Sequence, residues 1–328
     1  MKNIAIAAGG DSSEYGVSMR SAEGIYSFLD RERYNPYIVI VKTGAWQVLT
    51  PDGNKHDMDR NDFSAIVNGE KIRFDFVYIT IHGRPGEDGR LQGYLDMLGM
   101  PYSSCGVLGS ALTFNKYFNN AYLKSQHIRV ADSVRLTKGQ AADIETIISQ
   151  LGLPLFVKPN DGGSSYGITK VKEASQLQPA IDKAFSEGAE VIVESFVPGT
   201  EVTCGCYKTA SKAVVFPVTE VVTENEFFDY DAKYEGQVDE ITPARISEEL
   251  TETIQNQTLR IYDLVGAKGL IRIDYIIPAD NRPVLLEINT TPGMTATSFI
   301  PQQIKAAGLD IKDVITGIIE EELLKIVK

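Results

Sequence analysis

The sequence predicts an α/β fold, and three observations support this class. An apolar run at 4–8 ends in two glycines, which is typical of a buried parallel strand followed by a tight turn. Apolar side chains then recur at the spacing of one helix face, at Ala22, Ile25 and Leu29. Further apolar runs at 37–41 and 76–81 indicate two more strands. This order predicts a doubly wound parallel sheet whose strands end in ligand-facing loops.

The composition is that of a globular protein with several domains. The chain has 328 residues, of which 43% are hydrophobic and 23% are charged, and this length predicts two or three domains. Lys and Arg total 32 against 44 Asp and Glu, so the net charge of -12 argues against nucleic acid as a partner. No apolar run approaches the roughly 20 residues of a membrane helix. The N-terminus lacks a signal-peptide pattern, so we expect a cytoplasmic protein whose cysteines stay reduced.

Two further units follow the first along the chain. In the second unit we expect a helix at 110–125, a hairpin of strands at 155–158 and 168–171, a helix at 177–185 and a strand at 191–196. In the third we expect strands at 202–207, 214–222, 270–277 and 284–288, with helices at 248–265 and 301–307. A polar segment at 223–243 carries few core residues and is predicted to be a lid.

The last two predicted strands carry polar side chains suited to a metal ion. Arg272 and Asp274 alternate with apolar residues, as do Glu287 and Asn289, so each pair shares one face of its strand. If the prolines of the connecting loop are in register, Asp274 lies opposite Glu287, and Arg272 lies opposite Asn289. Opposed carboxylates destabilise a sheet unless a cation lies between them, and magnesium prefers such oxygen ligands. The alternative to a magnesium site is a solvated polar face of the sheet.

Three other segments are candidate ligand sites. The glycine-serine loop at 161–167 follows Lys158 and could cradle phosphate groups, or it could be only a flexible hairpin tip. The segment 82–89 combines glycines with charged residues after a strand, and the alternative is a salt-bridged turn. Glu14 could hold a substrate ammonium group, or it could simply favour the start of a helix. The residues alone leave these alternatives open.

Six segments together resemble one family over nearly the whole chain. They are 9–14 with 17–18, 82–89 with 92–93, 158–159 with 163–165, 229–234, 272–274 and 287–295. In this order and spacing they resemble the D-alanine–D-alanine ligase family of ATP-grasp enzymes. The resemblance implies a three-domain ATP-grasp architecture, in which two α+β domains enclose ATP. The implied domains are 1–104 (N-terminal α/β, substrate), 105–197 (central ATP-grasp) and 198–328 (C-terminal ATP-grasp and catalytic).

The resemblance also implies roles for individual residues. Nucleotide contacts would come from Lys116 and Lys158 on the phosphates, and from Glu194, Val197, Glu201, Phe227 and Lys233 around the rest of ATP. Two magnesium ions, which manganese could replace, would be held by Asp274, Glu287 and Asn289. The implied catalytic set is Glu14 on the first D-alanine, Ser298 on the second, Arg272 with Gly293 on the oxyanion, and Ser164 with Tyr234 linking Glu14 to the lid.

The implied reaction joins two D-alanines for peptidoglycan precursor synthesis. ATP would be converted to ADP and phosphate through a D-alanyl phosphate intermediate, and the implied oligomer is a homodimer formed through the N-terminal domain. One alternative is a D-alanine–D-lactate ligase, which the intact Lys233-Tyr234 pair disfavours. Another is a non-catalytic ATP-grasp nucleotide-binding regulator, which should have lost at least one of four residues that are all present: Lys158, Arg272, Glu287 and Asn289. Four positions depart from the family's usual residues, namely Tyr15, Ser104, Asn115 and Ser195.

Overall fold

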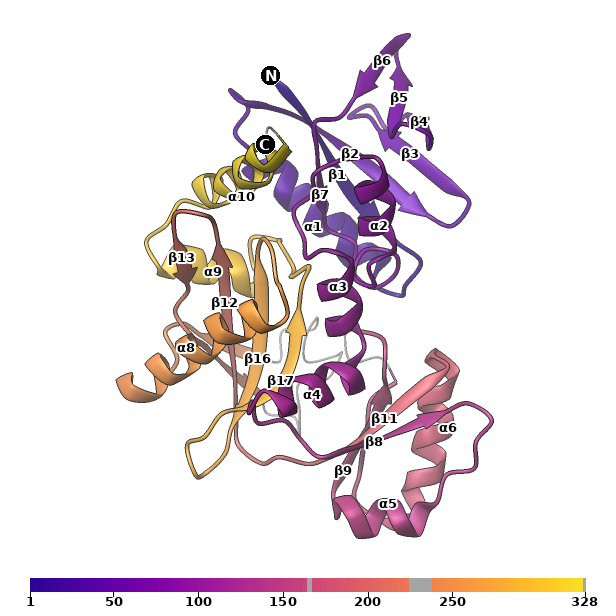
Figure 1. Ribbon diagram of the computed structural model, residues 1–328, viewed down its shortest axis with the longest axis vertical. Coiled ribbons are helices and arrows are strands. Elements are labelled where there is room, and N and C mark those ends of the chain that lie inside the picture. The colour runs from indigo at the N-terminus through magenta and orange to yellow at the C-terminus, as the bar shows by residue number, and fades with distance from the viewer. Residues whose placement is uncertain (164–166, 224–237, 327–328) are drawn as a thin grey trace.

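The computed structural model describes residues 1–163, 167–223 and 238–326, and they form three sheets (Figure 1). In the first sheet, β1 (Lys2–Gly9) pairs in parallel with β2 (Tyr34–Lys42) and β7 (Phe76–Ile79). Helix α1 (Tyr15–Phe28) connects β1 to β2 and buries Ala22 and Ile25, as their spacing predicts. The strand order is β6-β5-β4-β3-β2-β1-β7.

The first sheet is mixed, because antiparallel strands extend its parallel part. These are β3 (Ala45–Leu49), β4 (Lys55–Asp59), β5 (Ser64–Val67) and β6 (Glu70–Arg73). The predicted parallel strands are confirmed, whereas the four antiparallel strands were not predicted. The loops after β1 and β7 lie at the carboxyl ends of neighbouring parallel strands, so they meet at one edge of the sheet. Helix α2 (Arg90–Met97) follows the second of these loops.

The second sheet is antiparallel and has the strand order β10-β9-β11-β8. Its strands are β8 (Ser133–Thr137), β9 (Leu155–Pro159), β10 (Thr169–Val171) and β11 (Glu190–Ser195). The predicted hairpin of β9 and β10 is confirmed, with Thr169 opposite Val157. Helices α5 (Ile144–Leu151) and α6 (Leu177–Glu187) and the short 3-10 helix η1 (Ala174–Gln176) accompany the sheet, and α5 and α6 share its apolar core.

The third sheet has the order β15-β14-β12-β16-β17, and β13 also pairs with β12. The strands are β12 (Thr200–Lys208), β13 (Ala213–Val215), β14 (Thr219–Thr223), β15 (Val238–Ile241), β16 (Ile271–Ile277) and β17 (Val284–Asn289). Its helices are α8 (Glu248–Leu264), α9 (Phe299–Ala306) and α10 (Ile311–Ile326). The single strand predicted at 214–222 is therefore two strands. The predicted lid at 223–243 ends in β15, and its part from 224 to 237 lies outside the described residues.

Two helices connect the first sheet to the second. They are α3 (Val107–Phe114) and α4 (Lys116–Ser125), and the single helix predicted at 110–125 is interrupted between them at Asn115. The Asn115 side chain accepts a hydrogen bond from the Phe118 backbone N–H at 3.0 Å and so caps α4. This cap places Lys116 at the first position of the helix.

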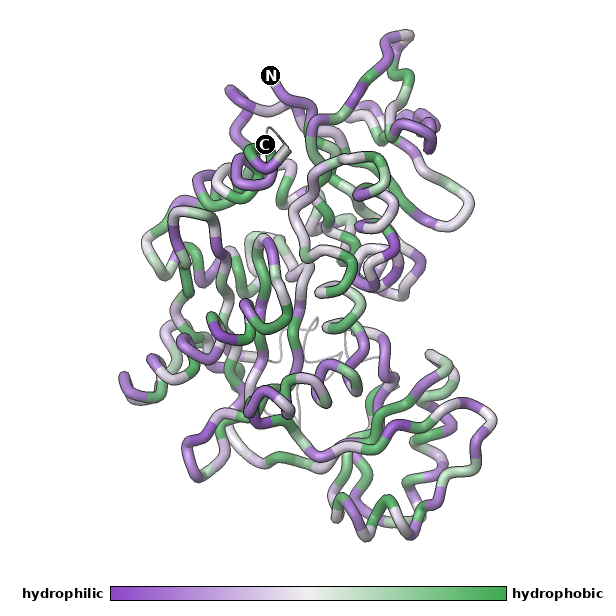
Figure 2. Tube along the Cα trace, in the orientation of Figure 1, coloured by the Kyte–Doolittle hydropathy of each residue, from purple (hydrophilic) through white to green (hydrophobic). Residues whose placement is uncertain are grey.

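The two ends of the chain share one apolar core. Ile4 and Ile6 of β1 pack in the same buried cluster as Ile315 and Ile319 of α10. Hydrophobic and hydrophilic residues alternate along α10 (Figure 2), as expected for a helix with one buried face. The second sheet has a separate core, and Figure 1 shows it apart from the rest of the molecule, next to α4. Within the described ranges, no helix is long and apolar enough to cross a membrane.

Candidate active site

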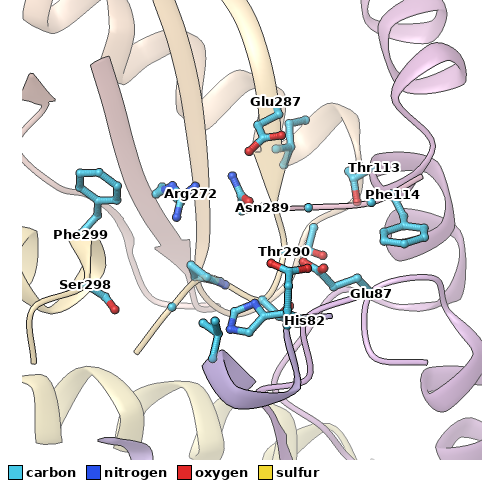
Figure 3. Close-up of a pocket in the computed structure, with 18 of the residues that line it drawn as sticks. His82, Glu87, Thr113, Phe114, Arg272, Glu287, Asn289, Thr290, Ser298 and Phe299 are labelled. Carbon is cyan, nitrogen blue, oxygen red and sulfur yellow. The ribbon is translucent and has the colours of Figure 1, made fainter. Parts of the chain in front are cut away.

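A polar cleft of about 590 Å³ lies where the three sheets meet. Its walls come from the loops after β1 and β7, from α3 and α4, from Gly162 and Gly163, and from β17 with the segment that leads into α9. Figure 3 shows Arg272, Glu287 and Asn289 on one side and His82 with Glu87 on another. Charged side chains from distant parts of the sequence therefore face one shared space.

The register of β16 and β17 places four of the predicted residues together. Asp274 lies opposite Glu287, and Arg272 lies opposite Asn289, as predicted. Nearer the hairpin loop, however, Tyr275 pairs with Leu285, so the register there is shifted by one residue. A bulge on β17 absorbs this shift and leaves Leu286 as the extra residue. Both Leu286 and Glu287 line the cleft.

Four hydrogen bonds hold the Asp274 carboxylate. Arg272 donates from Nε to Oδ1 and from Nη2 to Oδ2, both at 2.8 Å. The Thr203 hydroxyl donates to Oδ1 at 2.6 Å, and the Asn289 amide donates to Oδ2 at 3.1 Å. Burial by itself would lower the pKa of Arg272, but the adjacent Asp274 and Glu287 carboxylates outweigh it and raise that pKa. The guanidinium is thus a fixed positive charge at the cleft wall.

The oxygen donors of this group fit a magnesium ion in part. Glu287 and Asn289 line the cleft, while Asp274 is only 6% exposed and is not a cleft-lining residue. Carboxylate and amide oxygens are the donors that magnesium prefers. Because Arg272, Thr203 and Asn289 together donate four hydrogen bonds to the two oxygens of Asp274, at least one of these donors must move before Asp274 can bind a metal ion directly. The described residues contain no cluster of three or more His, Cys, Asp or Glu side chains suited to a metal.

Lys116 points from the start of α4 into the cleft. Its ammonium group donates to the Gly162 carbonyl at 2.6 Å and lies 3.9 Å from Glu287. Burial lowers the pKa of Lys116, and Glu287 partly opposes this shift. The group is therefore held between the glycine loop and the carboxylate, where an anion could bind.

Lys158 and Glu194 form a buried ion pair on neighbouring strands of the second sheet. The Lys158 ammonium lies 2.6 Å from Glu194, whose other oxygen accepts a bond from the Asn120 amide at 3.2 Å. Asn120 lines the cleft, but neither member of the ion pair does. Val197, in the connection from β11 to β12, and Glu201, on β12, also lie outside the cleft lining.

Glu14 faces the glycine loop from the end of the first sheet. It is 7% exposed, and a Cβ atom at Gly163 would lie only 2.7 Å from its Oε2 atom. Nearby, burial and then the Glu14 carboxylate raise the pKa of Glu87 to about 7. Burial lowers the pKa of His82, and its Nε2 atom lies 3.4 Å from the Ser21 hydroxyl. The salt-bridged turn considered for 82–89 is present at Arg84 and Asp88, yet the same loop also lines the cleft.

Gly293 and Ser298 lie next to each other at the start of α9. The Ser298 hydroxyl accepts a hydrogen bond from the Thr295 backbone N–H at 3.1 Å. A Cβ atom at Gly293 would lie 3.0 Å from the Oγ atom of Ser298. Both residues line the cleft, and Figure 3 shows Ser298 beside Phe299 on the side of Arg272. The geometry therefore brings the predicted oxyanion and second-substrate residues together.

Four predicted site residues lie outside the described part of the chain: Ser164, Phe227, Lys233 and Tyr234. Other residues line the cleft without having been predicted as site residues, among them Arg20, Asn119, Asn120, Glu240, Thr290 and Phe299. Arg20 and Glu240 carry no sequence signal of their own, because a single charged residue on a helix or edge strand is usually only solvated. Thr290 directly follows β17, and Phe299 directly follows Ser298. Their position next to predicted site residues is the signal that could have identified them.

Comparison with known proteins gives one consistent result. The family model "D-ala D-ala ligase N-terminus" matches residues 3–105, and "D-ala D-ala ligase C-terminus" matches residues 122–320. The D-alanine–D-alanine ligase of Parabacteroides distasonis is 70% identical over 322 residues, covering 98% of each chain.

Solved structures agree with these sequence matches. The VanG D-Ala:D-Ser ligase from Enterococcus faecalis is 30% identical, with a TM-score of 0.85, over 98% of this chain and 99% of that one. The D-alanine–D-alanine ligase of Bacillus anthracis complexed with ATP is 28% identical, with a TM-score of 0.78, over 99% of this chain and 98% of that one. With these matches and a cleft lined by Arg272, Glu287 and Lys116, the chain belongs to the D-alanine–D-alanine ligase family.

Proposed function

We propose that the protein joins two D-alanines in an ATP-dependent reaction that supplies peptidoglycan synthesis. The observation that carries this proposal is the convergence of Arg272, Glu287 and Asn289 with Glu14 and Lys116 on one cleft. The identity of 70% to a D-alanine–D-alanine ligase over nearly the full chain supports the same activity. ATP as the phosphoryl donor is supported by the similarity to an ATP-bound structure.

The residues proposed to contact the nucleotide come from both the second and the third sheet. Lys116 and Lys158 contact the phosphates, and the contact of Lys158 with Glu194 at 2.6 Å supports a shared place for these two residues beside the nucleotide. The other proposed contacts are Glu194 and Val197 at the adenine, Glu201 at the ribose, and Phe227 and Lys233 from outside the described residues. Asp274, Glu287 and Asn289 would hold magnesium, which would offset negative charge on the phosphoryl oxygens. In this arrangement the positive charges of Lys116, Lys158 and Arg272 offset the repulsion between phosphate and carboxylate oxygens.

The protein's own groups then position the two amino acids. Glu14 binds the ammonium group of the first D-alanine, and Ser298 binds the carboxylate of the second. The first carboxylate attacks the γ-phosphorus of ATP, ADP leaves, and the resulting D-alanyl phosphate is attacked by the second amine. Arg272 and the backbone N–H of Gly293 stabilise the oxyanion that develops, and phosphate leaves as the peptide bond forms. Ser164 and Tyr234 link Glu14 to the lid, which excludes water from the acyl phosphate.

The second substrate is the point at which relatives differ. The similarity to a D-Ala:D-Ser ligase makes D-serine a candidate, and D-lactate is the depsipeptide alternative. The intact Lys233-Tyr234 pair favours D-alanine. The test is mass spectrometry of products formed from magnesium-ATP with equal D-alanine, D-serine and D-lactate. We expect mostly D-alanyl-D-alanine. A product that contains mainly D-serine or D-lactate at its second position would reassign the second substrate. The absence of any product would support the alternative of a non-catalytic nucleotide-binding regulator.

Three broader features belong to the same proposal. The protein acts in the cytoplasm and has domains at 1–104, 105–197 and 198–328. It forms a homodimer through the N-terminal domain, where Met97 on α2 is 82% exposed. Light scattering coupled to gel filtration measures the oligomer directly, and a monomeric mass at working concentrations would contradict this part.

A further inference from the structure

Arg84 and Asp161 form an ion pair between two loops of different sheets. Arg84 belongs to the loop after β7, and Asp161 belongs to the glycine loop after β9. We propose that this pair is a positioning device that fixes residues 161–163 against Glu14 and Lys116, and so keeps ATP use coupled to dipeptide formation. The inference rests on the proposed ligase function but concerns residues to which the above mechanism gives no role.

The Arg84 side chain is held from several sides. Its Nη2 atom pairs with the Asp161 carboxylate, and its Nε atom lies 3.5 Å from Asp88. Its guanidinium carbon lies 5.8 Å from the centre of the Phe114 ring, on the cleft-lining end of α3. The guanidinium therefore connects the loop after β7, the glycine loop and α3. A planar group with several donors suits such a junction better than an ammonium group does.

The backbone around Arg84 is tied to the loop that carries Glu14. The Arg84 carbonyl accepts a hydrogen bond from the Asp11 N–H at 3.0 Å. A Cβ atom at the preceding Gly83 would lie 2.9 Å from the Cβ atom of Ser12, so these loops are in close contact. Arg84 is thus anchored to the first-substrate side of the cleft before it reaches Asp161.

Asp161 is directly followed by two residues that touch the proposed machinery. The Gly162 carbonyl accepts a hydrogen bond from Lys116 at 2.6 Å. Gly163 lies so close to Glu14 that a Cβ atom there would be 2.7 Å from a carboxylate oxygen. A displacement of Asp161 would therefore move both the partner of the phosphate-binding lysine and the wall beside the first D-alanine. This is the reason why we assign a positioning role to the pair.

The pair is not expected to determine global stability. The Arg84 side chain is 49% exposed and that of Asp161 is 17% exposed, and ion pairs near the surface stabilise a fold only weakly. Its effect should instead be local, on a loop between two separate cores. The readouts must therefore separate loop position from folding.

The experiment is a double-mutant cycle on the whole protein, with Arg84→Gln, Asp161→Asn and the double variant. Arg90→Gln is the matched control, because Arg90 follows the same loop and pairs with Asp88 at 3.0 Å but has no contact with Asp161. Hydrogen exchange of a peptide covering 155–163, without substrates, reports loop position. Phosphate released per dipeptide formed reports coupling, and the KM for ATP reports positioning of the nucleotide.

We expect each single variant to raise phosphate released per dipeptide and the KM for ATP by about threefold to tenfold, with faster exchange at 155–163 and an unchanged Tm. The double variant should be no worse than either single one, Arg84→Lys should recover part of the loss, and Arg90→Gln should match the wild type. Additive effects, or exchange equal to that of Arg90→Gln, would overturn the proposal. If the wild type makes no dipeptide, the proposed function fails, while the exchange data still decide the loop pair.

Discussion

Glu287 is the residue on which the metal proposal depends most directly, because it lines the cleft and lies opposite Asp274. We expect Glu287→Gln to lose magnesium-dependent turnover by about a hundredfold or more, while the fold survives. The measurement is turnover over a magnesium titration, with the Tm recorded alongside. The same substitution at the exposed Glu252 on α8 is the control. Activity like that of the wild type at saturating magnesium would remove Glu287 from the metal site.

Arg272 should act on the rate more than on ATP affinity, because an oxyanion develops only during the reaction. Alanine would leave the buried Asp274 carboxylate without its bidentate partner, so Arg272→Lys is the better variant. We expect kcat to fall by roughly 10² to 10³ while the dissociation constant of ATP changes little. Single-turnover kinetics and equilibrium binding separate the two quantities. A defect confined to ATP binding would assign Arg272 to the nucleotide instead.

We expect the raised pKa of Glu87 to make the free energy of unfolding depend on pH near neutrality. Burial and the Glu14 carboxylate raise the pKa of Glu87 to about 7, above the value of a free side chain. A raised carboxyl pKa contributes stability that is present below the unfolded pKa and is lost as the pH rises through the folded pKa. Glu87→Gln should therefore gain Tm relative to the wild type from about pH 5 to about pH 8. A constant difference in Tm over this range would show that Glu87 does not titrate there.

The residues that the sequence could identify are those with a strict spacing. The pairs Arg272–Asn289 and Asp274–Glu287 were predictable because strand alternation and hairpin pairing leave few choices. A regular hairpin would keep the same register up to the loop, but the bulge at Leu286 shifts the register there by one residue. Glu240 could not be predicted, because its place at the cleft depends on how β15 packs.

At the scale of elements, α1 approaches the catalytic segment at one glycine. A Cβ atom at Gly24 would lie 2.0 Å from the carbonyl oxygen of Met294, the neighbour of Gly293. Gly24→Ala would normally stabilise a helix by about 1 kcal/mol, but here the backbone leaves no room. We expect a lower Tm and reduced activity, because the segment carrying Gly293 must move.

Gly317 in α10 is the matched control for this prediction. It also lies inside a helix, and an added Cβ atom would meet nothing within 4 Å. Gly317→Ala should leave activity unchanged and raise the Tm slightly. If Gly24→Ala and Gly317→Ala have the same Tm and the same rate of dipeptide formation, the close approach of α1 to Met294 does not affect activity.

Elements were predictable where their periodicity was strong. The apolar runs of β1, β2 and β7 and the alternation in β16 and β17 were sufficient. The strands β4 and β6 carry mostly polar residues, so their apolar signal is too weak to detect. Asn115 caps α4 and so separates it from α3. The apolar periodicity continues across Asn115, so it does not reveal this break. In each case a tertiary contact or a cap overrides the local pattern.

At the scale of the whole molecule, the apolar residues divide into separate cores. Ile315 of α10 is buried with the first sheet, whereas Ile181 of α6 is buried in the core of the second sheet. Large-to-small substitutions in a core cost about 2–5 kcal/mol. We expect Ile315→Ala to destabilise the first and third sheets together, and Ile181→Ala to destabilise the second sheet alone. Hydrogen exchange resolved along the chain checks this difference. Equal destabilisation everywhere in both variants would indicate a single cooperative unit.

The core shared by β1 and α10 also has a consequence for synthesis of the protein. The ribosome makes β1 early and α10 late, yet Ile4 and Ile6 are buried against a cluster that includes Ile315 and Ile319. While the chain is still growing, α1 can already pack on that face, but the part of the cluster that α10 covers lacks its partner, so it is a surface on which nascent chains can aggregate or bind a chaperone. The loop after β1, which carries Glu14, is therefore translated early, but its surroundings are complete only after α10 has been made.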